Sequence, residues 1–141
     1  MTTPPSGYRE IEHTADWQLE AWASDLPALL EQAARGMYAL AGVRFAVGPL
    51  VQRQVDLHAF DAESLLVRFL AELLYFSGQE GLAFDAFHLQ LNQDAEGYHL
   101  HAELGGAPLA GVDKEIKAVT YHNLAVRTTE RGLEASVVFD V

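Results

Sequence analysis

The segment 24–42, SDLPALLEQAARGMYALAG, has the spacing of an amphipathic helix and signals for both of its ends. It opens at Ser24-Asp25, Pro27 falls in the first turn, and Gly42 closes it. Its apolar residues recur at the i, i+3, i+4, i+7 positions that share one buried face, namely Leu26, Leu29, Leu30, Ala33, Ala34, Met37, Leu40 and Ala41. The segment therefore predicts a helix that packs against the core along one side.

A second segment, 61–78, DAESLLVRFLAELLYFSG, predicts another helix of the same kind. Asp61 is a good N-cap, and we expect the helix to run to Gly78. Its apolar stripe consists of Leu65, Leu66, Phe69, Leu70, Leu73 and Leu74. We interpret the stripes of both helices as core and not as grooves for a partner.

Most of the remaining sequence alternates between apolar and polar residues with the period of two expected of half-buried strands. The alternation covers four segments, 17–23, 51–58, 87–92 and 98–104. A hairpin turn is expected around 92–97, and segments 117–127 and 133–141 predict a second hairpin. The order of these elements predicts an α+β sandwich with a mainly antiparallel sheet and two helices packed on one face.

The length and composition fit a single globular domain. The chain has 141 residues, half of them hydrophobic, and we expect residues 1–7 to form a flexible tail and 8–141 the domain. The absence of cysteine excludes disulfides, thiolate catalysis and zinc-finger sites. We see neither a signal-peptide pattern nor an apolar run of membrane-spanning length, so we expect a cytoplasmic protein without a membrane partner.

The net charge of −11 bears on the kind of partner. Nine Lys and Arg face twenty Asp and Glu, whereas direct nucleic-acid binding usually needs a basic face. Strong direct binding of RNA or DNA is therefore not expected. A basic protein partner or a bound cation fits the charge better, although the acidity also fits a role in solubility alone.

Two neighbouring carboxylates close the sequence, the side chain of Asp140 and the main-chain carboxylate of Val141. Such oxygens are the ligands that Mg²⁺, Ca²⁺ and Mn²⁺ prefer. Asp16 could complete a site if the first and last strands lie side by side, or it could merely fix a local turn. A solvated acid at a frayed end is the alternative for Asp140, but the apolar run up to Val141 favours a terminus that is docked.

Three further residues are candidates near these acids. His13 could orient a carboxylate, serve as a ligand or simply cover the sheet. In the segment 114–122, KEIKAVTYH, the two lysines and the histidine, with Lys117 and His122 as the candidates, could receive a phosphate or pair with a carboxylate. The lysines could equally deter pairing at the edge of a sheet.

Several short motifs, in this order along the chain, resemble the archease family. They are EHTAD at 12–16, ARGM at 34–37, KAVTYH at 117–122 and VFDV at 138–141. The resemblance implies a small α+β domain that assists an RtcB-type RNA ligase, which joins RNA ends using GTP and a divalent metal. Archease-like proteins promote guanylylation of the ligase and multiple turnover, in tRNA splicing or RNA repair, and are not ligases themselves.

The resemblance also assigns roles to residues. It implies a metal site of Asp16, Asp140 and Val141, with Ca²⁺, Mg²⁺ or Mn²⁺ as the cofactor and GTP shared with the ligase. Lys117 would be a further functional position. The family often has a longer loop with an acid and a histidine before the lysine motif, whereas here the segment 106–113, GAPLAGVD, is compact and lacks histidine, with Asp113 as a stand-in for the acid.

Two other functions remain open on sequence. A small metal-dependent phosphohydrolase could use Asp16 and Asp140 as ligands, with His13 or His122 as the base. A plain interaction module would make no specific use of the terminal acids. The sequence also leaves self-association open.

Overall fold

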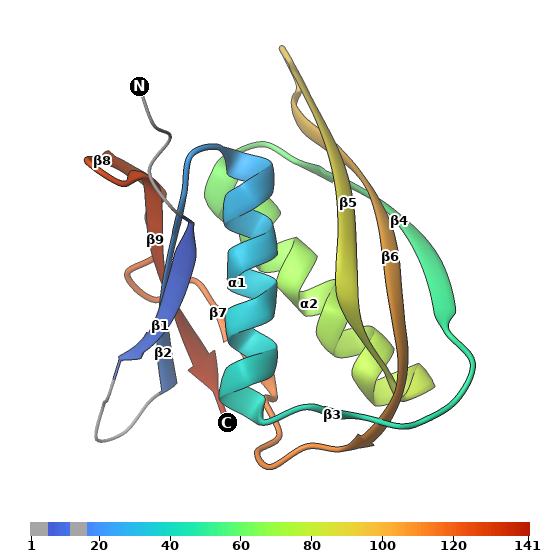
Figure 1. Ribbon diagram of the computed structural model, residues 1–141. Coiled ribbons are helices and arrows are strands. Elements are labelled where there is room, and N and C mark those ends of the chain that lie inside the picture. Colours follow the sequence, from blue (N-terminus) through green and yellow to red (C-terminus); the bar gives the residue numbers. More distant parts are fainter. Residues whose placement is uncertain (1–5, 12–16) are drawn as a thin grey trace.

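The computed structural model describes residues 6–11 and 17–141, and it shows two antiparallel sheets with two helices between them (Figure 1). The first helix contacts strands of both sheets, and so does the second. Each sheet therefore has one face covered by helices and one face toward solvent. In the described part of the chain, neither helix is long and apolar enough to cross a membrane.

The first sheet combines both ends of the described chain. Its strands are β1 (Gly7–Ile11), β2 (Trp17–Ala23), β7 (Ala118–Thr120), β8 (Arg127–Thr129) and β9 (Gly132–Asp140). Their order is β1-β2-β9-β7, and β8 pairs with the start of β9. The pairing of β1 with β2 includes Gly7, so the strand begins one residue before the expected domain boundary.

The second sheet is formed by the middle of the chain. Its strands are β3 (Arg44–Phe45), β4 (Val51–Ala59), β5 (Leu82–Asp94) and β6 (Gly97–Gly111). The long strand β6 pairs with β4, with β5 and, at its far end, with β3. The expected hairpin between β5 and β6 is confirmed, and it turns between Asp94 and Gly97.

The helices begin where the capping residues predict. Asp25 accepts a hydrogen bond from the Ala28 N–H at 2.9 Å before α1 (Leu26–Ala41), and Gly42 ends this helix with a left-handed φ of 66°. Asp61 accepts from the Ser64 N–H at 2.7 Å before α2 (Ala62–Glu80).

The predicted end of the second helix at Gly78 is wrong by two residues. Gly78 continues the helix to Glu80, and Gly81 provides the left-handed C-cap with a φ of 65°. Glycine is the residue most often found at a helix C-cap, and both Gly78 and Gly81 satisfy this preference. The sequence does not distinguish them, and the prediction took the first.

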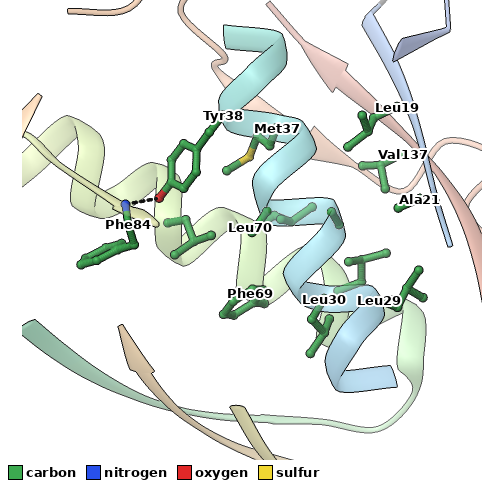
Figure 2. Packing of buried hydrophobic residues seen from close by; sticks show 14 of the residues in the cluster. Leu19, Ala21, Leu29, Leu30, Met37, Tyr38, Phe69, Leu70, Phe84 and Val137 are labelled. Carbon is green, nitrogen blue, oxygen red and sulfur yellow. Dashed lines mark hydrogen bonds between the residues drawn. The ribbon is translucent and has the colours of Figure 1, made fainter. Parts of the chain in front are cut away.

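The core lies between the two sheets, around the helices. Figure 2 shows Leu19, Ala21 and Val137 of the first sheet on one side of α1, with Phe69 and Leu70 of α2 on the other side. The fully buried large side chains include Leu29, Leu30, Phe69, Leu70 and Phe84. The Phe84 N–H donates to the Tyr38 hydroxyl at 3.3 Å, which ties α1 to the second sheet.

The α+β class, the mainly antiparallel pairing and the two helices are confirmed. We expected one sheet, but the strands form two sheets, because the pair of helices has apolar residues on both sides and each side packs against a sheet.

The predicted strand over 117–127 is interrupted: β7 and β8 are separate, and the turn between them contains Asn123 with a φ of 51°. A left-handed residue cannot continue a strand, so the chain leaves β9 there and returns.

Candidate functional site

Strands β2 and β9 lie side by side, as the proposed metal site requires. Their register pairs Trp17 with Phe139 and Ala23 with Leu133. Asp16 and His13 lie outside the described residues. Asp16 nevertheless precedes Trp17 in the sequence by one position, and Trp17 pairs with the residue before Asp140.

The end of β9 is docked, which confirms the interpretation of its apolar pattern. Phe139 is buried and pairs with β2 on one edge and with Val119 of β7 on the other. The Lys117 N–H donates to the Asp140 carbonyl at 2.8 Å. Val141 is half-buried and packs against the core. The backbone that carries the terminal carboxylates is therefore held in place.

The side chain of Asp140 points to solvent. It lies on the outer face of the first sheet, while Val137 and Phe139 point into the core. In residues 6–11 and 17–141, no ion pair involves the Asp140 carboxylate. Its negative charge is thus available for a cation.

The donor chemistry fits a hard divalent cation, but the described residues supply only part of a coordination shell. Asp140 and the terminus at Val141 offer carboxylate oxygens at the end of one fixed strand. Within the described ranges, no group of three or more His, Asp or Glu side chains is arranged to hold a metal ion. The further ligand predicted from the sequence, Asp16, lies outside those ranges.

The other acids on the outer face are neutralised. Arg131 donates to Glu20 at 2.6 Å and to Glu134, and its guanidinium lies 4.0 Å from the centre of the Trp22 ring. The hydrogen bond from Arg131 holds the pKa of Glu20 below its ordinary value. This cluster is built on Trp22 and Glu134, which pair with each other at the opposite end of the β2–β9 pair from Asp140.

The backbone of Lys117 is hydrogen-bonded to Asp140, but the residue also takes part in a separate structural feature, a cavity. It lines a cavity of about 660 Å³ between the two helices and the segment 112–119. Lys114 lines the same cavity, and its ammonium lies 5.6 Å from the centre of the Trp17 ring. The sequence singled out the lysines, but the cavity is formed by segments far apart in the chain and had no local signal.

His122 is not placed next to Asp140. It follows Thr120, which pairs with Val138, so it lies farther back along β9. It lines a polar cavity of about 430 Å³ together with Gln18, Arg127 and Ser136. A hydrolase that uses His122 as the base for a metal at Asp140 is therefore not favoured by this geometry.

Asp113, the stand-in acid of the compact loop, is engaged elsewhere. It forms an ion pair with Arg44, and its N–H donates to the Ala41 carbonyl at 2.9 Å. These contacts fasten the loop to the end of α1. Asp113 thus has a structural role in the described chain.

Comparison with known proteins gives a consistent result. The model of the archease protein family matches residues 8–141. Protein archease of Methanosarcina acetivorans is 34% identical over 146 aligned residues, covering 100% of both chains. Protein archease of Archaeoglobus fulgidus is 32% identical, covering 95% of this chain and 98% of its own.

Two solved structures share the fold. The solution structure of protein 1598 of Methanobacterium thermoautotrophicum has a TM-score of 0.77 at 27% identity, covering 96% of this chain and 99% of that chain. A crystal structure from Thermotoga maritima, described as an archease and possible chaperone, has a TM-score of 0.66 at 21% identity, covering 94% and 96%. The second likeness shows the fold alone. From the family match and the identity to full-length relatives, the chain belongs to the archease family.

Proposed function

We propose that this chain is an accessory protein that activates an RtcB-type RNA ligase in the cytoplasm, in tRNA splicing or RNA repair. It would do so by holding a divalent cation, Ca²⁺, Mg²⁺ or Mn²⁺, at Asp16, Asp140 and the terminal carboxylate of Val141. The membership of the archease family supports the accessory role. The observation that carries the site is the pairing of β9 up to Asp140, directly beside the start of β2.

The geometry of the chain end at Asp140 and Val141 suits the binding of a cation and a partner. Asp140 is exposed at the end of a strand that is paired on both edges, and Val141 follows it directly, so the two carboxylates need little ordering when a partner binds. A bound divalent cation would supply positive charge for the phosphates of GTP at the ligase. The strongly acidic chain also suits a partner with a basic surface, as expected of a protein that handles RNA.

The test is RNA-ligase turnover by the cognate RtcB-type enzyme, with the native chain, Asp140→Ala, and a chain extended after Val141. We expect stimulation by the native chain only, because each change removes or blocks one anionic ligand. Asp85→Ala is the matched control, since Asp85 is also an exposed strand acid but lies on the second sheet. Stimulation that survives both Asp140→Ala and the extension, in folded proteins, would contradict the metal site.

A second readout separates the proposed activator from an enzyme. The purified chain alone, with metal, should release no phosphate from RNA ends or GTP. Phosphate release that Asp140→Ala abolishes would instead support the phosphohydrolase. No stimulation by any variant, with the native fold intact, would refute the activator role.

A further inference from the structure

One cavity of the described chain has the character of a ligand site, and none of the residues that line it belongs to β9. It is enclosed by the C-terminal halves of α1 and α2 and by the segment 112–119. Its volume of about 660 Å³ falls in the range of small-molecule sites. The walls are mostly apolar and include the buried residues Met37, Tyr38 and Ile116, with Leu74 and Val119.

Positive charge gathers at this cavity in an otherwise acidic protein. Lys114 and Lys117 are the only two lysines of the sequence, and both line the cavity. In the part of the chain that the structure describes, neither lysine forms an ion pair. Glu115 stands between them and also lines the cavity, so the two lysines outnumber the one acid there. Both residues are exposed, so their alkyl chains can extend the apolar wall while the ammonium groups stay at its solvent side.

We propose that this cavity binds a small amphipathic anion. The aromatic or aliphatic body of the ligand lies against Met37, Leu74 and Val119, and its carboxylate, phosphate or sulfonate group lies at Lys114 and Lys117. An apolar wall with two cations at one side selects this class, because a neutral apolar ligand gains nothing from the ammonium groups. A fully polar anion, in turn, would leave the apolar wall without a partner.

The cavity is connected to the end of β9. Lys117 donates its N–H to the Asp140 carbonyl, and Ala118, which also lines the cavity, pairs with Asp140. A ligand in the cavity therefore contacts the segment 117–119, which is hydrogen-bonded to the end of β9. The proposal does not depend on the RNA-ligase function, and its test uses the isolated full chain.

The test compares two fluorescent probes that share one ring system. The first, 8-anilino-1-naphthalenesulfonate, carries a sulfonate, and the second, N-phenyl-1-naphthylamine, does not. We expect one sulfonate probe per chain, and about tenfold weaker binding to Lys114→Gln/Lys117→Gln. Binding of the neutral probe should not change in that variant. Arg68→Gln/Arg127→Gln removes the same charge from two other cations without ion pairs in the described chain, and it should leave both probes unaffected.

Gly78 offers a second, steric arm of the test. It lines the cavity from within α2, and a Cβ atom there meets nothing within 4 Å. Gly78→Leu should therefore fold and should weaken both probes by partly filling the cavity. Gln79→Leu is the matched control, because it adds the same side chain at the next, exposed position of α2, which does not line the cavity.

Three results would overturn the proposal. The first is equal affinity of the native chain and the double lysine variant for the sulfonate probe. The second is unchanged binding of both probes by Gly78→Leu. The third is loss of the sulfonate probe on Val47→Ser/Leu50→Ser, since these residues form an exposed apolar loop elsewhere. Near-ultraviolet circular dichroism and thermal unfolding establish that each variant is folded.

Discussion

The packing of α1 on β2 predicts opposite effects for the same substitution at two helical glycines. Gly36 lies where α1 crosses the first sheet, and a Cβ atom there would be 2.7 Å from both methyl groups of Leu19 and 2.9 Å from the Tyr8 ring. These distances fall well short of the 3.4 Å at which ordinary contact begins. Gly78 in α2 has no atom within 4 Å of such a Cβ.

The magnitudes follow from two opposing terms. Replacing a helical glycine by alanine stabilises a protein by about 1 kcal/mol through helix propensity. Overpacking costs about 1–3 kcal/mol where the neighbour cannot move. Leu19 is only 1% exposed, so it has little room to yield. We therefore expect Gly78→Ala to stabilise by about 1 kcal/mol and Gly36→Ala to be neutral or destabilising by up to about 2 kcal/mol.

Urea unfolding followed by tryptophan fluorescence measures both free energies. The control is Gly36→Ala in a Leu19→Ala background, where the clash with Leu19 is absent and the substitution should be more favourable than in the native chain. Gly36→Ala that stabilises the otherwise native chain as much as Gly78→Ala would refute the account of close packing between α1 and β2.

Three further outcomes are expected. Phe139→Ala should lower the free energy of unfolding by about 3–5 kcal/mol, because its ring is buried, whereas exposed Asp140→Ala should leave it nearly unchanged; chemical denaturation of both variants checks this. The hydrogen bond that His101 donates to the Asp56 carboxylate raises the pKa of His101 above 6.5, so the stabilisation from this pair is present below pH 6.5 and is lost as pH rises through the raised pKa. Asp56→Asn should return the His101 pKa toward 6.5 in an NMR titration, and an unchanged pKa would contradict the assignment. Asp61→Ala should lower the free energy of unfolding by about 1 kcal/mol, because the Ser64 N–H loses the carboxylate that accepts its hydrogen bond; thermal unfolding of the variant checks this.

The elements of this fold were largely predictable, but their assembly was not. Capping residues and apolar spacing located both helices because these signals are local in the chain. The apolar residues up to Val141 likewise favoured a docked chain end, and Phe139 is indeed buried. A period of two, however, tells which face a residue occupies and not which strand lies beside it. The division into two sheets and the interruption at Asn123 therefore appear only in the structure.

For the candidate site, too, the individual residues could be predicted from the sequence, but their arrangement in space could not. The sequence identified Asp140, Val141 and Lys117, and the structure adds that their backbones meet at one end of β9. The cavity beside them is formed by parts of α1, α2 and the segment 112–119, which are separated in the sequence. No periodicity or motif joins such segments, so a cavity of this kind has no signature in a single sequence.

The position of β9 has a consequence for how the chain folds during synthesis. This strand follows every other described element, yet it pairs along the whole of β2, which comes near the beginning. The second sheet can form as soon as β6 has been made, because its strands lie together in the middle of the chain. Until β9 is made, β2 has one edge without a partner and α1 has an incomplete cover, so the nascent protein exposes a site for faulty pairing. Translation therefore leaves the first sheet, with the candidate metal site, to be completed last.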